Sequence, residues 1–294
     1  MNKNQKLPLA IVADILGTSK KVVNSWSENK LKPIIDKKTG KKFFHLDELR
    51  SLPSASFLFD TKWDEEERIK PQRNYKIIEL FAGAGGLALG LEKAGFQSLL
   101  LNEIDRDACE TLKKNRVNWN VKNCDIKEYD FTKFKGKVDL LTGGFPCQAF
   151  SYAGKKLGFN DTRGTLFYEF ARAVKETNPK VILAENVKGL VSHDSGKTLE
   201  TIRDIIDEIG YELVEPKVLK AIFYKVPQKR ERIFLVAIRK DLSRFVSFNY
   251  PAKFPKIFTL KDALKKGVLF NKDVPKTEGQ IYPQRKKEIL SKVP

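Results

Sequence analysis

The feature that most constrains this fold is an alternation of apolar runs and helical patterns that starts at Tyr75 and continues to about residue 240. Short apolar runs bounded by turn residues are typical of buried parallel strands, and stretches between them, such as 166–177, have the spacing of amphipathic helices. Strands alternating with helices predict an α/β fold with a doubly wound, mostly parallel sheet. The predicted strands are residues 75–80, 97–103, 138–141, 181–184, 212–219 and 233–238.

A second, smaller pattern precedes these strands and is predicted to form a module of its own over residues 1–56. Two stretches of helical spacing are separated by Gly17, and Ser19 can cap the second one. A hairpin with a lysine-rich tip and a short helix are predicted to follow. This arrangement resembles the winged helix-turn-helix of MerR and excisionase-type proteins, which implies DNA binding; a scaffold that binds no DNA is the alternative. Residues 57–74 are polar and predict a linker.

The charge of the chain is unevenly distributed. The formal net charge is +18, of which residues 1–74 carry +5, residues 75–213 carry none and residues 214–294 carry +13. Basic segments on both sides of a neutral catalytic core suit an enzyme that binds a polyanion, because counterion release from phosphates contributes much of the affinity for nucleic acid. A solvated lysine surface without a partner is the alternative.

Cysteine and histidine are few and scattered. The three cysteines, Cys109, Cys124 and Cys147, form no CxxC pair, and only two histidines could add an imidazole ligand. This pattern argues against both a disulfide framework and a metal site. No apolar run approaches the length of a membrane span, and we expect a cytoplasmic protein.

Glycine and acidic residues at the ends of the first two predicted strands, and an Asp-Ile pair at 125–126, indicate a ligand site. A glycine turn at 81–86 follows the first strand, and Phe81 adds an aromatic face beside it. Glu103 ends the second strand, where a carboxylate can accept hydrogen bonds from ribose hydroxyls. Asp125 can bind an adenine edge, and Ile126 adds an apolar wall. The turn is not GxGxxG, so the pattern favours an adenosyl ligand without a pyrophosphate, S-adenosylmethionine.

Reactive and charged side chains follow further strands of the same sheet. Cys147 stands in a loop just after a predicted strand, with Pro146 restricting the backbone before it. Glu185 follows the run 181–184, and Arg230 and Arg232 alternate at the start of the last strand. Because carboxyl ends of parallel strands share one edge, we expect a thiol, an acid and two arginines to lie close together.

From residue 76 to about 240 the sequence closely resembles the C5-cytosine DNA methyltransferases. The resemblance rests on five ordered motifs, which occupy residues 81–86, 144–151, 163–167, 185–187 and 228–232. It implies a Rossmann-like methyltransferase domain over 75–240 that uses S-adenosylmethionine to methylate cytosine in duplex DNA, in a restriction-modification system.

The resemblance also implies individual roles. Cys147 would be the nucleophile, Glu185 the acid at cytosine N3 and Arg232 a ligand of the base carbonyl, with Arg230 in support. The residues implied to bind S-adenosylmethionine are Phe81, Ala82, Gly83, Gly85, Gly86, Leu87, Glu103, Ile104, Asp125, Ile126, Pro146 and Leu166.

The last part of the chain departs from the family pattern. Residues 241–294 are predicted to open a truncated target-recognition region, because the family's later motifs are not found. We therefore expect either a second polypeptide that supplies them or a truncated copy of the enzyme. Two other functions stay open: a non-catalytic DNA-binding regulator derived from such an enzyme, and a tRNA cytosine methyltransferase.

Overall fold

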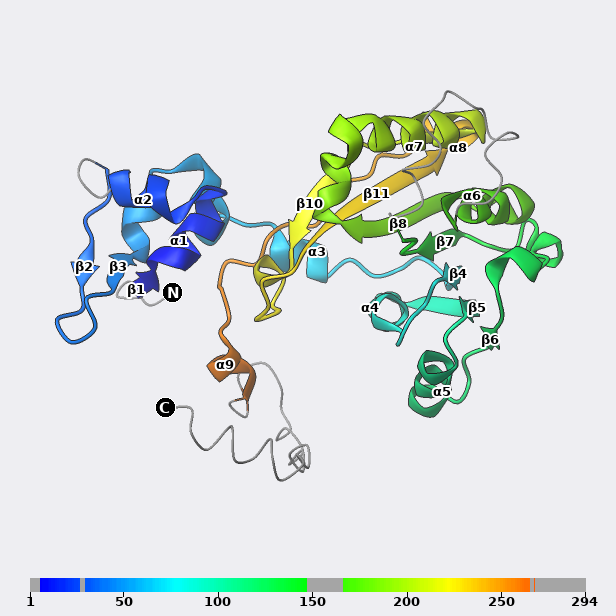
Figure 1. Cartoon of the computed structure of the whole chain (residues 1–294), viewed down its shortest axis with the longest axis horizontal. Coiled ribbons are helices and arrows are strands. Elements are labelled where there is room, and N and C mark those ends of the chain that lie inside the picture. Colours follow the sequence, from blue (N-terminus) through cyan, green and yellow to red (C-terminus); the bar gives the residue numbers. More distant parts are fainter. Residues whose placement is uncertain (1–5, 27–29, 147–165, 265–266, 268–294) are drawn as a thin grey trace.

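The centre of the molecule is a twisted sheet with helices on both faces (Figure 1). The computed structural model describes residues 6–26, 30–146, 166–264 and 267. Within them the sheet has eight strands in the order β10-β11-β8-β7-β4-β5-β6, and β9 also pairs with β11. The strands are β4 (Tyr75–Leu80), β5 (Phe96–Glu103), β6 (Val121–Asn123), β7 (Leu140–Gly143), β8 (Val181–Val187), β9 (Tyr211–Leu213), β10 (Lys217–Lys220) and β11 (Glu231–Arg239).

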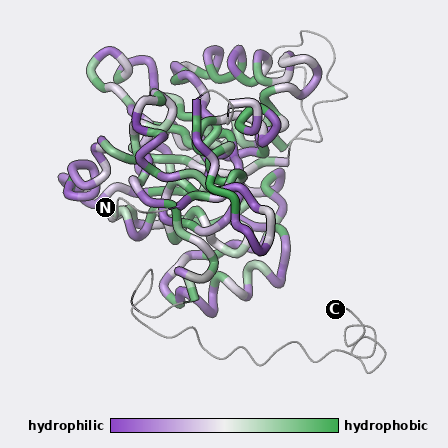
Figure 2. Tube along the Cα trace, turned by 90° about the vertical axis from the view of Figure 1, so that its left-hand side faces the viewer, coloured by the Kyte–Doolittle hydropathy of each residue, from purple (hydrophilic) through white to green (hydrophobic). Residues whose placement is uncertain are grey.

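Helices cover the two faces in the way that a doubly wound sheet requires. Helices α4 (Gly86–Lys93) and α5 (Arg106–Asn115) pack on one face, and α6 (Leu166–Thr177) and α7 (Lys197–Glu208) pack on the other. Strands β6, β5, β4, β7 and β8 are mutually parallel, whereas β9, β10 and β11 are antiparallel to their partners. Apolar residues gather in the inner strands, and the outer helices alternate between apolar and polar residues (Figure 2). The predicted α/β fold with a mostly parallel sheet is therefore confirmed.

Several predicted strands have other bounds in the structure, and one strand was missed. Strand β7 spans 140–143 instead of 138–141, and β11 spans 231–239 instead of 233–238. The predicted strand 212–219 is two strands, β9 and β10, because Pro216 between them has no N–H to donate to the sheet. Strand β8 continues to Val187 because it pairs with β11 along its whole length. The short edge strand β6 was not predicted, since three residues are too few to show a periodicity.

The amino-terminal part contains both predicted helices and the predicted hairpin. Helix α1 (Leu9–Leu16) ends at Gly17, whose φ of 66° is left-handed, and α2 (Lys20–Trp26) follows. Strands β1 (Lys6–Pro8), β2 (Ile34–Ile35) and β3 (Lys42–His45) form a small antiparallel sheet in the order β1-β3-β2. DNA binding by this part stays a prediction.

The core of this amino-terminal part extends into the rest of the chain. Phe57 and Leu58 of the 3₁₀ segment η2 (Pro53–Leu58) are buried in it, although the sequence placed them in the linker. The same cluster contains Ile222 and Phe223 of η8 (Ala221–Phe223), as well as Ile257. Contacts between residues more than 150 positions apart leave no periodic signal, so the sequence did not show this shared core.

The predicted linker also contains structure. Helix α3 (Trp63–Glu67) packs on the segment after β11: the Trp63 and Phe254 rings lie 5.2 Å apart, and Glu66 accepts a hydrogen bond from the Ala252 N–H at 2.8 Å. Two short helices follow in the predicted recognition region, α8 (Lys240–Ser243) and α9 (Leu260–Leu264). The domain limits stay predictions. None of the helices that the structure describes is long and apolar enough to cross a bilayer.

A buried carboxyl lies in the middle of the sheet. Glu79 of β4 is 2% exposed, and its Oε2 has no hydrogen-bond partner among the described residues. Burial raises the pKa of Glu79 to about 8. The proton is therefore held more tightly in the folded protein than in the unfolded chain, so the free energy of unfolding falls as pH rises from about 5 to about 8.

Replacing Glu79 by glutamine is expected to remove this pH dependence. A glutamine cannot ionise, so the variant loses a slope that approaches about 1.4 kcal/mol per pH unit in that window, and it gains stability on the alkaline side. Urea denaturation from pH 5 to pH 8.5 measures the slope, with the exposed Glu110→Gln as the control. Parallel curves for wild type and Glu79→Gln would contradict the prediction.

Candidate active site

A cavity of about 520 Å³ opens at the carboxyl edge of the parallel strands. It lies near the neighbouring strands β4 and β7, where the connections turn to opposite faces of the sheet, which is where α/β proteins bind ligands. Each part of its wall comes from the carboxyl end of a parallel strand or from the start of α6. The lining residues are Phe81, Asn102, Glu103, Ile104, Cys124, Asp125, Ile126, Lys127, Gly144, Pro146 and Leu166.

The glycine turn after β4 shapes one side of this cavity. Phe81, Gly83 and Gly85 all have positive φ, with values of 56°, 52° and 86°. A Cβ at Gly85 would lie 2.6 Å from Leu112 and 3.0 Å from Trp119, so only glycine allows α5 to pack this closely. The turn thus brings the Phe81 ring to the cavity and starts α4.

Glu103, at the end of β5, holds the turn and the next loop by its carboxylate. Its Oε2 accepts a hydrogen bond from the Gly83 N–H at 2.7 Å, and its Oε1 accepts two at 2.9 Å, from the N–H groups of Ile104 and Asp105. A carboxylate offers about four acceptor positions, so about one is left for a ligand hydroxyl. The sequence predicted only the ligand role, because it could not show the three backbone donors.

Replacing Glu103 by alanine is therefore expected to affect both binding and folding. Loss of the acceptor weakens S-adenosylmethionine binding by about 1.5–3 kcal/mol, and each backbone N–H left without a partner costs a further 1–3 kcal/mol or so of stability. Titration calorimetry and thermal unfolding measure the two effects, with Glu110→Gln on the surface of α5 as the control. An unchanged melting temperature would show that the hydrogen bonds from the backbone to Glu103 contribute nothing to stability.

The far wall of the cavity is polar at its rim and apolar at depth. Asp125 accepts a hydrogen bond from the Lys127 N–H, which holds its carboxylate at the mouth, and Ile126 behind it is buried. The Asn102 amide donates to the carbonyl oxygen of Cys124 at 3.0 Å and joins β5 to the loop after β6. The wall therefore combines two fixed carboxylates with flat apolar surfaces.

The predicted cofactor residues fall into two groups. Phe81, Glu103, Ile104, Asp125, Ile126, Pro146 and Leu166 line the cavity. Five others form the glycine turn and the start of α4 and do not line the cavity: Ala82, Gly83, Gly85, Gly86 and Leu87. Four lining residues were not predicted: Asn102, Cys124, Lys127 and Gly144. The signals that could have found them were the sequence positions of Asn102, Cys124 and Lys127 near Glu103 and Asp125, and the place of Gly144 at the start of the motif 144–151.

The side chains that line this cavity fit an adenosyl group. Two carboxylates can accept hydrogen bonds from ribose hydroxyls and from an adenine amino group, and Phe81, Ile126 and Leu166 offer apolar contact to the base. Among the lining residues that the structure describes, Lys127 is the one cation, which favours an adenosyl group without a pyrophosphate. No group of His, Cys, Asp and Glu among the described residues could hold a metal ion.

The catalytic carboxylate predicted from sequence lies beside this cavity. Arg232 Nε donates to Glu185 Oε1 at 2.8 Å, and Arg230 lies 3.6 Å from the same oxygen. The antiparallel register of β8 and β11 places Arg232 opposite Val187, so the two side chains meet diagonally across the strands. A Cβ at Gly144 would be 3.3 Å from Glu185 Oε2. The structure thus brings together Glu185, both arginines and the loop after β7.

The residues just before Cys147 are fixed in place, although Cys147 itself lies outside the described residues. Phe145 is 2% exposed, and its ring lies 4.9 Å from Phe167 and 5.6 Å from Phe170 of α6. The Asn186 amide donates to the Phe145 carbonyl at 2.8 Å. Asn186 follows Glu185, so one strand end holds the acid and anchors the loop that leads to the cysteine.

The two described cysteines are poor candidates for a nucleophile. Burial, and then the neighbouring Glu103 carboxylate, raises the pKa of the Cys109 thiol. Burial also raises the pKa of the Cys124 thiol, which lies in the cavity wall. A raised pKa leaves less thiolate at neutral pH, and this favours the assignment of the reactive thiol to Cys147.

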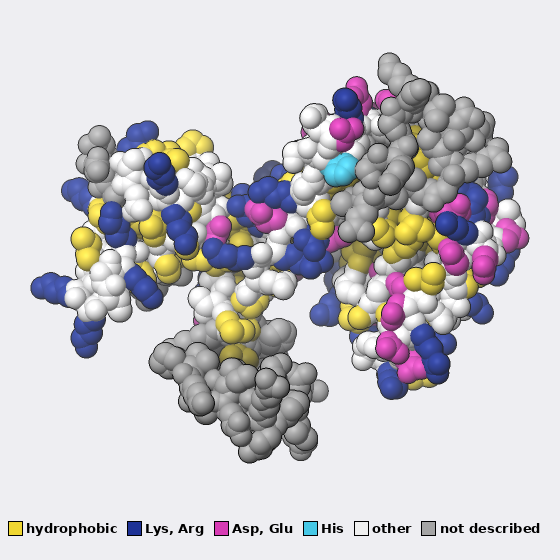
Figure 3. Space-filling model, viewed as in Figure 1, with side chains coloured by type: hydrophobic (Ala, Val, Ile, Leu, Met, Phe, Trp, Pro, Cys, Tyr) yellow, Lys and Arg dark blue, Asp and Glu magenta, His cyan; other side chains and the backbone are white. Residues whose placement is uncertain are grey.

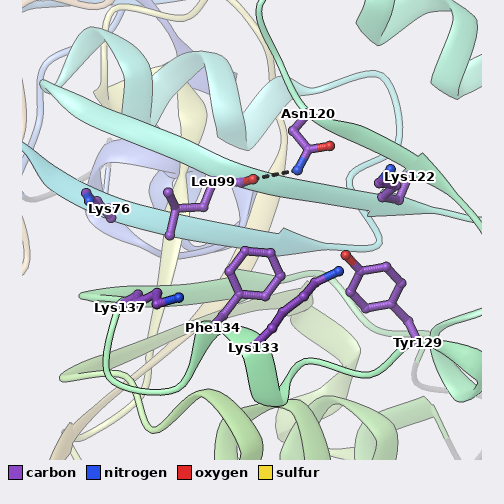
Figure 4. A pocket seen from close by; sticks show the side chains of 8 residues that line it. All are labelled: Lys76, Leu99, Asn120, Lys122, Tyr129, Lys133, Phe134 and Lys137. Carbon is purple, nitrogen blue, oxygen red and sulfur yellow. Dashed lines mark hydrogen bonds between the residues drawn. The ribbon is translucent and has the colours of Figure 1, made fainter.

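A second cavity, of about 430 Å³, contains none of the predicted site residues (Figure 4). Lys76, Lys122, Lys133 and Lys137 line it together with two aromatic rings, and the Lys133 ammonium lies 4.8 Å from the centre of the Tyr129 ring. It adjoins β6, the last strand of the sheet. Of the four lysines, Lys122 is on this edge strand, Lys76 is on the inner strand β4, and Lys133 and Lys137 lie in the connection between β6 and β7.

Comparisons with known proteins agree with this geometry. A family model, C-5 cytosine-specific DNA methylase, matches residues 75–291. The type II methyltransferase M.Eco47II of Escherichia coli is 58% identical over 99% of this chain, which spans 70% of that protein. M.PspPI of Psychrobacter is 54% identical over 97% of the chain, which spans 69% of it.

A solved structure is similar as well. A prophage-encoded DNA modification methyltransferase from E. coli superposes with a TM-score of 0.54 at 30% identity, over 65% of this chain and 54% of the other. The family match covers the sheet, the cavity and the Glu185 edge together. This chain belongs to the C-5 cytosine-specific DNA methylase family, whose members use S-adenosylmethionine as the methyl donor.

Proposed function

We propose that this protein transfers a methyl group from S-adenosylmethionine to C5 of cytosine in duplex DNA, as the methyltransferase of a type II restriction-modification system. The observation that carries the proposal is the Glu185–Arg232 pair. It lies beside Gly144, at the rim of a cavity whose carboxylates and apolar side chains suit an adenosyl group. The relatives M.Eco47II and M.PspPI carry the name type II methyltransferase, which supports the proposal.

The chemistry needs both a thiol and an acid. C5 of cytosine is too weak a nucleophile to attack a methyl group unaided, so the Cys147 thiolate adds to C6 while Glu185 donates a proton at N3. The ring becomes an enamine whose C5 attacks the sulfonium methyl that S-adenosylmethionine supplies. Transfer of the C5 proton to water then expels the Cys147 thiolate, and return of the N3 proton to Glu185 leaves neutral 5-methylcytosine.

Arg232 has the donors to serve both the acid and the base. Its Nε binds Glu185, and its Nη1 donates to the carbonyl oxygen of Glu231 at 2.8 Å. Its Nη2 would donate to the cytosine carbonyl, the role that the family resemblance implies for Arg232. Arg230, which is half exposed, adds positive charge near the same carboxylate. A cytosine inside a duplex cannot reach this edge of the sheet, so the base must be flipped out of the helix.

The same proposal disfavours the two other functions considered. A non-catalytic regulator would have no need of the Glu185–Arg232 pair or of a loop anchored by Asn186. A tRNA methyltransferase has similar chemistry, but the relatives that match most of this chain are named for type II modification. The expected second polypeptide has no support from the comparisons and stays a prediction.

Methyl transfer from tritiated S-adenosylmethionine tests the proposal. The purified protein is given genomic DNA lacking cytosine methylation or, separately, total tRNA, and the labelled nucleoside is identified by chromatography. Label recovered as 5-methyldeoxycytidine from DNA supports the proposal. Label in tRNA alone would identify a tRNA enzyme, and DNA binding without incorporation would identify a regulator.

A further inference from the structure

The hairpin of the amino-terminal part carries positive charge that nothing in the active site uses. We call residues 34–45, which comprise β2, β3 and the turn between them, the basic hairpin. Lys37, Lys38 and Lys41 are exposed on it, and Lys42 is partly exposed. None of these four lysines has an ion-pair partner among the described residues. Figure 3 shows Lys and Arg side chains, which share one colour, projecting from this end of the molecule.

The tip of the basic hairpin is a fixed turn. Asp36 accepts hydrogen bonds from the N–H groups of Lys38 at 2.8 Å and Thr39 at 3.0 Å. The Asp36 N–H donates to the Lys41 carbonyl at 2.9 Å, and Gly40 completes the turn with a φ of 65°. The lysines therefore project from an ordered backbone, so binding a polyanion through them orders only side chains.

The acids around the basic hairpin offset only part of its charge: Asp36, which interacts with Lys41, lowers the formal charge of residues 34–45 from +4 to +3. The described residues from 6 to 58 contain ten Lys and Arg but four Asp and Glu. Asp14 pairs with Lys229, Asp47 pairs with Arg50 and Glu48 accepts from the Lys32 N–H, while Asp36 is used by the turn. This end of the molecule thus presents a net positive field to its surroundings.

The amino-terminal part packs against η8, which lies between β10 and β11, and against the segment after β11. The Phe57 and Phe223 rings meet edge to face at 5.3 Å, and the Lys253 ammonium lies 4.7 Å from the first ring and 4.8 Å from the second. Lys229, which pairs with Asp14, directly precedes Arg230 in the chain. The basic hairpin therefore has a defined position relative to the base-binding edge, which a freely tethered module would lack.

We propose that the basic hairpin binds the phosphate backbone of the same duplex whose cytosine enters the active site, at a flank outside the base-binding edge. This inference rests on the proposed function, since it takes the substrate to be duplex DNA. Lysines that contact phosphates add affinity without base recognition. The hairpin thus lengthens the DNA that the enzyme covers and leaves the target sequence to other residues.

The length and salt dependence of DNA binding test the proposal. Dissociation constants are measured by fluorescence anisotropy, over a range of salt, for duplexes of about 14 and about 40 base pairs, or roughly 50 and 140 Å. The wild-type protein is expected to bind the long duplex more tightly and with a steeper salt slope. A variant with Lys37→Gln, Lys38→Gln, Lys41→Gln and Lys42→Gln is expected to lose about 3 to 4 units of that slope and about tenfold in affinity at low salt, on the long duplex alone.

Two further variants serve as controls. Gln at Lys113, Lys114, Lys133 and Lys137, which are near the opposite edge of the sheet, changes the net charge equally and is expected to leave the length dependence intact. Arginine at the four hairpin positions is expected to retain wild-type binding, and melting temperatures check that all variants fold.

The proposal is overturned if wild type binds both duplexes alike, if the hairpin variant weakens both equally, or if the distant control loses as much affinity. Methyl transfer to the short duplex is assayed with the same preparations. The hairpin variant should retain the wild-type kcat on the short duplex. A lack of methyl transfer in every preparation would refute the proposed function, and the binding data would still test whether the hairpin contacts DNA.

Discussion

DNA containing 5-fluorocytosine in place of cytosine is expected to become covalently attached to this protein, and Cys147→Ser is expected to abolish the attachment. Fluorine at C5 cannot leave as a proton, so the reaction halts after methyl transfer, with the Cys147 sulfur still bonded to C6. A serine hydroxyl is far less nucleophilic than a thiolate, and turnover on ordinary DNA should fall by about 10³-fold or more. Denaturing electrophoresis with labelled DNA and S-adenosylmethionine detects the adduct.

A matched control comes from the other cysteines. Cys109 is buried against the back of the cofactor turn, and its thiol has a raised pKa. Cys109→Ala should therefore leave the adduct intact, with a modest loss of stability from the small void. An adduct that persists in Cys147→Ser, or disappears in Cys109→Ala while that variant remains folded, would refute the assignment of the nucleophile.

Glu185→Gln is expected to lower kcat by about 10²–10⁴-fold while S-adenosylmethionine binding stays unchanged. A positioned acid contributes a factor of this size, and glutamine occupies the same volume but cannot donate the proton that cytosine N3 requires. Glu185 does not line the cofactor cavity, so the two readouts separate chemistry from binding. Single-turnover methyl transfer and titration calorimetry measure them.

Glu231 provides the control for this variant. It precedes Arg232 in β11, and its carboxylate binds Lys188 at 3.1 Å and Lys220 at 3.2 Å, whereas Glu185 pairs with Arg232. Glu231→Gln should retain most of the activity. Equal losses in both variants would mean that the charge balance of β11, rather than proton donation by Glu185, controls the rate.

Local patterns in the sequence were sufficient for the architecture. Strand β4 and helix α6 have the bounds that their periodicity predicted, and the turn after β4 contains the glycines that its positive φ values require. These features depend on a few consecutive residues and on the burial of one face, which a sequence records directly. The same holds for the placement of Glu103 at a strand end, whereas the strand before Asp125, β6, was too short to be predicted.

The use of each side chain depended on contacts that only the tertiary structure brings about. The Glu103 carboxylate accepts hydrogen bonds from three backbone N–H groups. Asn186 donates to the carbonyl oxygen of Phe145, which lies 41 positions earlier in the sequence. The diagonal contact of Glu185 with Arg232 depends on the register of two antiparallel strands. The sequence alone determined which elements form and which residues reach the catalytic edge, because periodicity and turn chemistry are local. Only the tertiary structure decided which groups these residues contact and which core joins Phe57 to Phe223, because packing between distant segments leaves no local pattern in the sequence.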